Sequence, residues 1–415
     1  MELTWRWFGK NDKITLAMLR QIGVEGIVTA LHDIPNGEVW TREKIRELRQ
    51  YIEAHDLRWS VVESLPVSES IKYGGADRDQ LIENYKQSLI NLALEDIHVV
   101  CYNFMPVLDW ARTDLLHPNP NGTSNLFFSH AQFAYFDIHI LKREQAENDY
   151  SADVIAEVEK LHQTLTPEDE HRLVENIIVK TQGFVSGNIK EDDEHPVELF
   201  RQLLSLYEGI DKEQLRENMR YFLEAIMPVC EQYDIYMCVH PDDPPFPILG
   251  LPRIVNCEAD IDWLFKAVDN PRNGLTFCAG SLSAGCHNDV VGMARKYAQR
   301  TWFVHMRSCE VFPNGDFTEA SHLGGRANLL ELARIFEQER LNRAHDIRIG
   351  KYPKHLASTF LSLPMRVDHG MTMLGDEQRG YNAGYSFLGR MFALGQVQGL
   401  LHAVDDELGV NRNLD

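Results

Sequence analysis

The chain carries the apolar run Gly26-Ile27-Val28-Thr29-Ala30-Leu31, then a segment from Thr41 to His55, and then Leu57-Arg58-Trp59-Ser60-Val61-Val62-Glu63. The two runs are short, apolar and rich in β-branched residues, so each predicts a buried strand. The segment between them places apolar residues such as Ile45 and Leu48 at helical spacing, which predicts a helix. Strand, helix and strand in this order are typical of a parallel sheet with helices on its outside.

The same alternation continues along the chain and predicts eight strands, the number that closes a (β/α)₈ TIM barrel. The other expected strands are 3–9, 97–104, 235–240, 274–278, 301–305 and 361–368, and the other expected helices are 14–22, 80–94, 211–233, 261–268, 290–300 and 327–339. Between about 109 and 210 the pattern breaks, with helical pieces only near 151–163 and 197–207. We therefore expect one barrel domain over 1–415 with a long, mainly helical insertion after strand four.

Charge and composition exclude several classes of protein. The 415 residues carry 41 Lys and Arg against 62 Asp and Glu, a net charge of −21 that argues against a nucleic-acid-binding surface. The seven cysteines include no Cys-x-x-Cys pair, so a reducing compartment fits better than a disulfide framework. Neither a signal-peptide pattern nor an 18-residue apolar run is present, and we expect a cytoplasmic protein without a membrane span.

The last four predicted strands end in residues that can bind a metal ion: His240, Cys278, His305 and Asp368. Each has a plain structural alternative, such as a buried core cysteine or a histidine that caps a turn. In a barrel, however, the carboxyl ends of the strands meet at one mouth. Four potential ligand residues at four successive strand ends therefore predict a metal site, and the mixed set suits Zn²⁺, Fe²⁺ or Mn²⁺.

The neighbouring residues suggest the remaining roles. His369 is a candidate general base because imidazole titrates near neutral pH, and Tyr385, in a glycine-flanked loop, is a candidate acid. Arg307 and His322 follow the seventh strand and are candidates to bind a substrate carboxylate. Asn103 on strand four is a candidate to bind a hydroxyl group. For the last three residues, a surface or supporting role is an equally good interpretation.

Several ordered motifs resemble the mannonate dehydratase family, whose metal-dependent members act in hexuronate catabolism. The resemblance covers nearly the whole chain. It rests on Thr4-Trp5-Arg6-Trp7-Phe8-Gly9, Trp59-Ser60-Val61-Val62-Glu63-Ser64, Cys101-Tyr102-Asn103-Phe104-Met105-Pro106, His240-Pro241-Asp242-Asp243-Pro244-Pro245, Cys278-Ala279-Gly280-Ser281, His305-Met306-Arg307-Ser308, Asp368-His369-Gly370 and Gly384-Tyr385-Ser386 with Gly389-Arg390.

The resemblance implies a xylose-isomerase-like barrel, a bound Mn²⁺ or Fe²⁺, and loss of water from D-mannonate to give 2-keto-3-deoxy-D-gluconate. It carries the family's metal ligands onto the four strand-end residues named above, and its acid–base pair onto His369 and Tyr385. Two departures from the family pattern stand out. An arginine is missing from 283–289, and Val367 replaces a common proline. The missing arginine leaves the identity of the sugar acid open.

Two other hypotheses fit the same residues. A sugar isomerase or epimerase on the same barrel would share the metal but conserve the mass of its substrate. A non-catalytic homologue would bind a sugar acid without turning it over. In each case the expected partner is a small sugar acid, and the long insertion favours a homo-oligomer.

Overall fold

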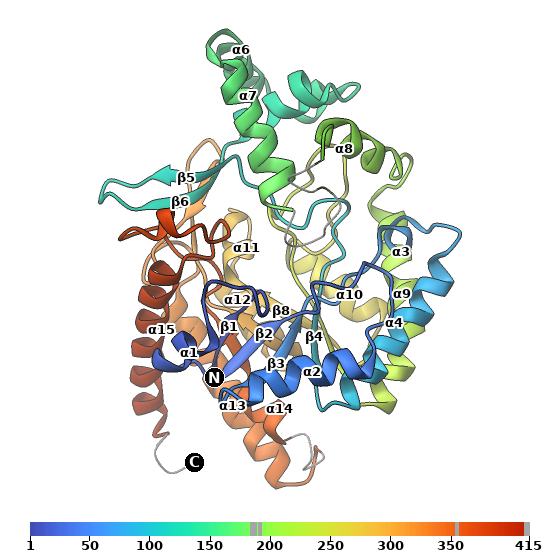
Figure 1. Ribbon diagram of the computed structural model, residues 1–415, viewed down its shortest axis with the longest axis vertical. Coiled ribbons are helices and arrows are strands. Elements are labelled where there is room, and N and C mark those ends of the chain that lie inside the picture. Colours follow the sequence, from blue (N-terminus) through green and yellow to red (C-terminus); the bar gives the residue numbers. More distant parts are fainter. Residues whose placement is uncertain (183–188, 190–192, 353–356, 411–415) are drawn as a thin grey trace.

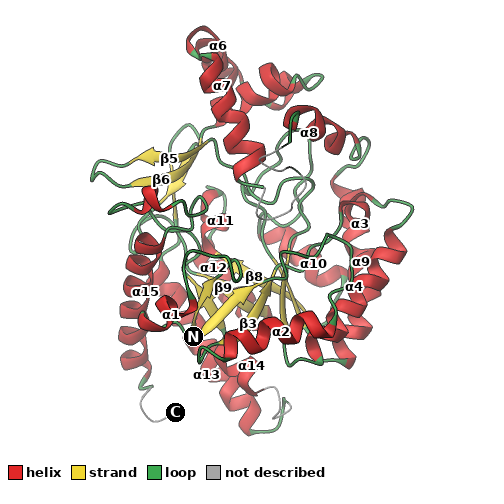
Figure 2. Ribbon diagram, in the orientation of Figure 1, coloured by secondary structure: helices red, strands yellow, loops and turns green. Residues whose placement is uncertain are grey.

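A computed structural model describes residues 1–182, 189, 193–352 and 357–410. Within these residues, eight parallel strands close into a barrel in the order β1-β12-β9-β8-β7-β4-β3-β2. Helices surround the strands on the outside (Figure 2). The predicted TIM barrel is therefore confirmed. The barrel strands are β1 (Glu2–Arg6), β2 (Gly26–Thr29), β3 (Arg58–Glu63), β4 (Val99–Tyr102), β7 (Tyr236–Val239), β8 (Asn273–Cys278), β9 (Thr301–His305) and β12 (Pro364–Arg366).

The helices that follow the strands largely match the predicted segments. The expected helix over 41–55, for example, begins after Thr41, whose side chain accepts a hydrogen bond from the amide of Lys44. Among the described residues, the helices outside the predicted insertion 109–210 are α1 (Leu16–Gln21), α2 (Arg42–Glu53), α3 (Glu69–Tyr73), α4 (Arg78–Ala93), α9 (Lys212–Gln232), α10 (Glu258–Ala267), α11 (Ala279–Ala284), α12 (Val290–Tyr297), η4 (Ala298–Arg300), α13 (Leu329–Arg348), α14 (Ala357–Ser362), η6 (Asp376–Arg379) and α15 (Phe387–Leu408).

The long connection between β4 and β7 contains a hairpin as well as helices. Its described elements before α9 are β5 (Asp114–Pro118), β6 (Ser124–Phe128), α5 (His130–Tyr135), η1 (Phe136–Leu141), η2 (Ala146–Asp149), α6 (Ala152–Thr164), α7 (Pro167–Val174), η3 (Glu175–Lys180) and α8 (Pro196–Ser205). Figure 1 shows α6, α7 and α8 at one end of the molecule, beyond the barrel strands. Residues 183–188 and 190–192 of the predicted insertion lie outside the described residues.

A second sheet joins this connection to the seventh strand's loop. The hairpin β5–β6 pairs with β10 (Cys309–Val311) and β11 (Phe317–Glu319) in the order β10-β11-β6-β5. All three pairings are antiparallel. The sequence pattern did not predict this sheet. It brings Glu319, at the end of β11, toward the barrel mouth, where it contacts residues from three other segments.

The eighth strand is shorter than predicted, because Leu361 and Ser362 belong to the end of helix α14. Only Pro364–Arg366 pair with neighbouring strands, β1 on one side and β9 on the other. Asp368 consequently follows the strand in a loop, with a left-handed φ of 64°. Short polar residues such as aspartate tolerate this conformation better than most, since they hydrogen-bond locally.

Alternate residues of the barrel strands pack into two separate apolar layers. Val61, Val99 and Cys238 belong to a small cluster made mainly of strand residues, which fills the barrel. Val62 and Val100 belong to the large cluster that also holds the buried faces of the helices. This period of two is the reason that the strands are apolar almost throughout. No helix in the described part of the chain is long and apolar enough to cross a membrane.

Candidate metal centre and active site

Three side chains at the carboxyl ends of neighbouring strands converge on one point. Among the described residues, His240, Cys278 and His305 form a group whose ligand atoms all lie within 4.8 Å of one another. Cys278 and His305 are the last residues of β8 and β9, and His240 directly follows β7. These strands are adjacent in the barrel, so their ends meet at the same level. The structure thus brings together three of the four residues that the sequence suggested as metal ligands.

The two histidines each have a ring nitrogen without a hydrogen bond to the described residues. His240 Nδ1 lies 2.7 Å from the Pro241 carbonyl oxygen, which can only accept, so Nδ1 carries the proton and Nε2 the lone pair. His305 is fully buried, and neither of its nitrogens has a hydrogen-bond partner in the described part of the chain. The nearest carboxylate oxygens, of Glu63 and Asp368, lie 3.5 and 3.7 Å from its nitrogens. A buried imidazole without a hydrogen bond is costly unless it binds something, so these residues fit a metal ion.

Cys278 and Asp368 complete the surroundings of the group. Burial raises the pKa of the Cys278 thiol to about 12, so the thiolate form needs a nearby cation. The Asp368 carboxylate oxygen Oδ2 lies 3.7 Å from both Cys278 Sγ and His305 Nδ1. Asp368 is therefore beside two of the three grouped ligands, as expected for a fourth donor. An N, S and O donor set of this kind suits a borderline divalent ion.

Asp368 is held in its charged form by buried arginines. Burial would raise the pKa of its carboxyl, but the charges of Arg366, His369 and Arg307 lower it well below the ordinary range. Arg366 also forms a two-point contact with Glu63 at 2.7 and 2.9 Å. Burial opposes ionisation of Glu63 as well, yet Arg366 and Arg6 bring its pKa down to about 2. Both carboxylates are thus anions at neutral pH.

The His369 ring lies between two aromatic side chains and two charged ones. Its centroid is 5.2 Å from that of Trp110 and 5.3 Å from that of Tyr385, the latter edge-to-face at 81°. Its Nδ1 atom is 2.6 Å from Arg307 Nη1 and 3.1 Å from Glu319 Oε1. Its Nε2 atom is 3.9 Å from Asp368 Oδ1. The two predicted acid–base residues, His369 and Tyr385, are therefore in contact beside the metal-binding group.

Tyr385 is buried, and its phenol stays protonated. Burial raises its pKa above the ordinary value, although the charge of Arg366 acts in the opposite direction. Phe8 packs against it edge-to-face with a centroid distance of 5.0 Å. A neutral phenol in such a place can donate a proton or a hydrogen bond to a leaving oxygen.

Arg307 lies at the centre of a buried ion cluster. Its Nη2 donates to Asp243 at 2.7 Å, its Nη1 lies 3.2 Å from Glu319, and its Nε lies 3.2 Å from Asp368. Arg112 bridges Asp243 and Glu319 from the other side, at 2.7 and 3.1 Å. Each guanidinium nitrogen of Arg307 therefore already faces a carboxylate of the protein itself.

The other two predicted substrate-binding residues have protein partners too. Asn103 follows β4 and hydrogen-bonds to the buried Asp109 carboxylate. His322 is buried, and its Nε2 donates to the Val367 carbonyl oxygen at 2.8 Å. His322 thus supports the loop that precedes Asp368.

The loop without the expected arginine receives a cation from elsewhere in the chain. Arg326 donates to the carbonyl oxygens of Ser283, Gly285 and Cys286 at 2.8 to 3.0 Å. Next to this loop, Gly280 leaves no room for a side chain, since a Cβ there would lie 1.8 Å from Arg307 Nε. The position of Arg307 thus depends on a glycine in the Cys278-Ala279-Gly280-Ser281 motif.

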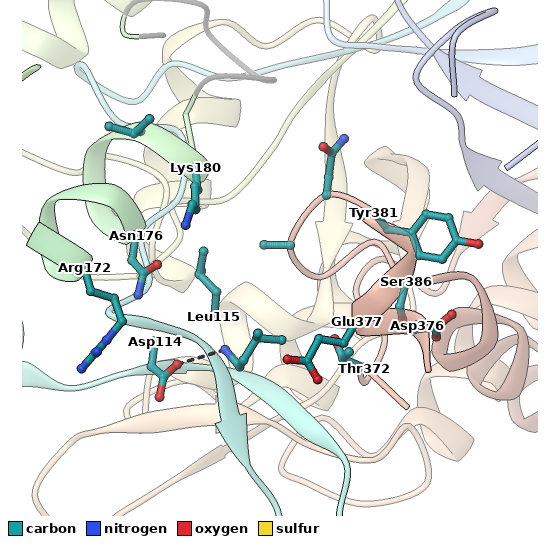
Figure 3. A pocket seen from close by; sticks show the side chains of 15 residues that line it. Asp114, Leu115, Arg172, Asn176, Lys180, Thr372, Asp376, Glu377, Tyr381 and Ser386 are labelled. Atoms are coloured by element: carbon teal, nitrogen blue, oxygen red, sulfur yellow. Dashed lines mark hydrogen bonds between the residues drawn. The ribbon is translucent and has the colours of Figure 1, made fainter. Parts of the chain in front are cut away.

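A cavity of about 690 Å³ borders the loop that carries Tyr385. Tyr381 and Ser386 line one side of it, and Arg172 and Lys180 line the other (Figure 3). The metal-binding group itself does not line this cavity. The cavity therefore lies beside the candidate centre, between the loop after β12 and helices of the β4–β7 connection.

Comparison with known proteins gives a consistent result. The family description D-mannonate dehydratase (UxuA) matches residues 1–410. A mannonate dehydratase from Marinomonas sp. (strain MWYL1) is 45% identical over 100% of both chains. One from Chromohalobacter salexigens is 42% identical, over 97% of this chain and 99% of that protein.

A solved structure agrees with these sequence matches. The crystal structure of mannonate dehydratase from Streptococcus suis serotype2 superposes with a TM-score of 0.74 at 30% identity, covering 99% of this chain and 97% of that one. The resemblance noted from the motifs is thereby confirmed. The chain, an enzyme of the hydro-lyase class, belongs to the D-mannonate dehydratase family.

Proposed function

We propose that this protein removes water from D-mannonate, or a closely related aldonate, to give 2-keto-3-deoxy-D-gluconate. The observation that carries the proposal is the convergence of His240, Cys278 and His305 within 4.8 Å, with His369 close by. Dehydration next to a carboxylate needs a base for the carbon-bound proton and an acid for the departing hydroxyl. The residues found beside the group fit both tasks.

We propose that the centre holds Mn²⁺ or Fe²⁺, with His240, Cys278, His305 and Asp368 as its ligands. When bound there, such an ion would stabilise the negative charge that develops on substrate oxygens next to the carboxylate. His369 and Tyr385 would handle the two proton movements, with the protonated phenol of Tyr385 suited to the departing hydroxyl.

Substrate positioning falls to Asn103, Arg307 and His322 in this proposal. Arg307 is rich in protein carboxylate partners, so its main effect would be to set the charge and shape of the site around the substrate. His322 would act through the nitrogen that does not bind the Val367 carbonyl oxygen. The homo-oligomeric state, the cytoplasmic location and the single-domain organisation stay predictions from the sequence.

The proposal is tested by supplying Mn²⁺-loaded protein with D-mannonate and a panel of other aldonates. We expect a 2-keto-3-deoxy acid, one water lighter than its substrate, from at least one of them. The metal-free protein and the His369→Asn variant serve as controls, and both should be inactive. A product of unchanged mass would indicate an isomerase or epimerase instead. Calorimetric binding without turnover would indicate a non-catalytic sugar-acid-binding protein.

A further inference from the structure

Arg253, in the loop after β7, is a buried arginine without a hydrogen bond from its side chain to the described residues. The side chain is fully buried, and Nε, Nη1 and Nη2 all lack a hydrogen-bond partner in that part of the chain. The Asp242 Oδ1 atom lies 3.8 Å from Nη1, close enough for an ion pair but too far for a hydrogen bond. A guanidinium has five N–H donors, so its burial is costly until acceptors reach them.

Other buried arginines in the described ranges receive acceptors from the protein itself. Arg112 donates to Asp243 at 2.7 Å. Arg343, near the amino-terminal end of β9, donates to Glu339 at 2.8 Å and to two carbonyl oxygens at 2.7 and 3.0 Å. These guanidinium groups hold segments of the protein together. Arg253 differs from them, because none of its side-chain donors joins it to another described segment.

The backbone around Arg253 is nevertheless fixed. The Asp242 carboxylate accepts a hydrogen bond from the Val255 amide at 2.7 Å, and the Asp242 amide donates to the Val255 carbonyl oxygen at 2.9 Å. The Asn256 side chain donates to the Arg253 carbonyl oxygen at 3.3 Å. The guanidinium therefore has a set position before a ligand binds, which lowers the entropy cost of binding.

Arg253 lies on the side of the barrel mouth that belongs to β4 and β7, two adjacent strands. Burial lowers the pKa of its guanidinium, whereas the nearby charges of Asp242 and Asp109 raise it. Asp109 belongs to the loop after β4 and accepts a hydrogen bond from Asn103, the residue expected to bind a hydroxyl group. Arg253, Asp109 and Asn103 thus form one group of hydrogen-bonding side chains, the β4–β7 corner.

The β4–β7 corner lies across the barrel mouth from the acid–base pair. Strand β12, which precedes the loop with His369 and Tyr385, has three strands between it and β4 in either direction around the barrel. The carbons next to the substrate carboxylate must meet the acid–base pair to react. The hydroxylated tail of the sugar acid is then the part that can reach the opposite side.

The charges in this corner favour neutral hydroxyl groups over a substrate carboxylate. Arg253 faces the carboxylates of both Asp242 and Asp109. Lys72, a second cation near Asp109, is already paired with Glu69 at 2.7 Å. Carboxylates therefore outnumber cations among these residues, and a further carboxylate would be repelled. A hydroxyl group, in contrast, accepts from the guanidinium and donates to a carboxylate.

We propose that Arg253 binds the hydroxylated tail of the sugar acid, beyond the C2 and C3 carbons that react. Its N–H groups donate to oxygens of the tail, while Asp109 accepts from the same hydroxyl groups. Arg253 thereby selects aldonates with a long, neutral tail. This role rests on the proposed function and extends it, since it names the part of the aldonate that the protein recognises.

Calorimetric binding of two acids tests this contact: D-mannonate, and the four-carbon aldonate with the same configuration at C2 and C3. The titrations use Mn²⁺-loaded His369→Asn protein, so that the bound acid is not turned over. We expect Arg253→Met, added to this background, to weaken D-mannonate binding about 10- to 100-fold, the range for hydrogen bonds from a charged donor. Binding of the four-carbon acid should change by less than about threefold, because it lacks the tail.

Arg343→Met is the matched control, since it removes another buried guanidinium near the opposite ends of the strands. It should leave both affinities unchanged within about threefold. In the absence of any acid, the two variants should also differ in stability. The urea midpoint should fall further in Arg343→Met than in Arg253→Met, because only the loss of Arg343 leaves buried acceptors without their donor.

Arg253→Lys provides a second variant that keeps the charge but loses the planar fork of donors. It should also weaken binding of D-mannonate more than binding of the four-carbon acid. Equal losses for the two acids in either variant would place Arg253 at the carboxylate or at the reacting carbons, and would overturn its role at the tail. Unchanged affinity for D-mannonate in either variant would show a guanidinium that only binds buried water, and would overturn it too.

Failure of the proposed function would be seen separately. If the wild-type protein releases no 2-keto-3-deoxy acid from any aldonate, the proposed dehydration is wrong. The difference between the two affinities, which is measured without turnover, still decides whether Arg253 contacts the tail.

Discussion

Cys278 is the donor whose chemistry changes most with a bound ion. Burial holds its thiol protonated, with a pKa near 12, and Ser281 donates to its sulfur at 3.1 Å from the hydroxyl. A bound divalent ion would displace that proton. We expect Cys278→Ser to weaken Mn²⁺ binding by at least about tenfold, measured by equilibrium dialysis with metal analysis. The matched control is Cys286→Ser, which alters an exposed thiol and should bind Mn²⁺ like the wild type. Equal affinity in both variants would exclude Cys278 as a ligand.

The lowered pKa of Glu319 predicts how the free energy of unfolding changes in acid. Its folded-state pKa of about 2 lies below its ordinary value of 4.5, so its ionised form stabilises the fold above pH 4.5. That contribution is lost as the pH falls from 4.5 toward 2, because the unfolded chain takes up the proton first. In denaturant titrations, the difference in unfolding free energy between wild type and Glu319→Gln should therefore be largest above pH 5 and shrink with acidification. A difference in unfolding free energy that grows below pH 4.5 would show that ionised Glu319 does not stabilise the fold.

The sequence indicated which side chains meet in space where the side chain stands at the end of a strand. His240, Cys278 and His305 each follow an apolar run, so the barrel pattern placed them at one level. Glu319 gave no such signal, since it ends a three-residue strand and meets His369 from 50 positions away. The contact between Arg112 and Glu319 spans 207 positions and depends wholly on the tertiary fold. The sequence analysis did not identify Arg366, although it is only two residues from Asp368. Its partner Glu63 lies 303 positions away in the sequence, so their contact depends on the tertiary fold.

The loop after β12 is held against the start of α15 by two glycines. A Cβ at Gly389 would lie 1.7 Å from the Met371 carbonyl oxygen, and one at Gly370 would lie 2.6 Å from the Arg390 amide. This loop carries both His369 and Tyr385, so its close packing against α15 fixes the positions of these two side chains. Only glycine allows the two backbones to approach this closely.

We expect Gly389→Ala to lower the free energy of unfolding by about 1–3 kcal/mol and to reduce turnover as well, because the loop must move. Gly395→Ala is the matched control in the same helix, since nothing lies within 4 Å of a Cβ there. The control should raise the free energy of unfolding by about 0.4–1 kcal/mol. Urea titration measures both values, and equal effects of the two variants would show that the close approach at Gly389 has no energetic consequence.

Whole elements were predictable in proportion to their burial. The strands β2, β3 and β9 are buried almost throughout, so their apolar runs stood out. The strands β5 and β10 are partly exposed, and their mixed composition is that of a loop. At the eighth strand, the apolar residues of α14 continue into β12, and Leu361 was therefore assigned to the strand although it is helical. Periodicity over so few residues cannot separate the two.

At the scale of the molecule, the net charge of −21 opposes the approach of an anionic sugar acid. The charged side chains at the centre nearly cancel, because the arginines are matched by buried carboxylates: Arg6, Arg112, Arg307 and Arg366 stand against Glu63, Asp243, Glu319 and Asp368. A divalent ion with its thiolate ligand would leave only a small positive excess. The long-range field that a substrate meets is therefore that of the whole acidic surface.

This balance predicts how turnover responds to salt. At about 10 mM ionic strength the Debye length is about 30 Å, and the surface charges repel a sugar acid over the whole approach. At about 150 mM it is about 8 Å, so that repulsion is screened while the short contacts inside the site are not. We expect kcat/KM for D-mannonate to rise about twofold to tenfold over this range, through a lower KM at constant kcat. Initial rates in NaCl and KCl measure it, and agreement between the two salts excludes a specific ion effect. If kcat/KM instead falls as salt is added, a local positive field at the mouth outweighs the net charge of the chain.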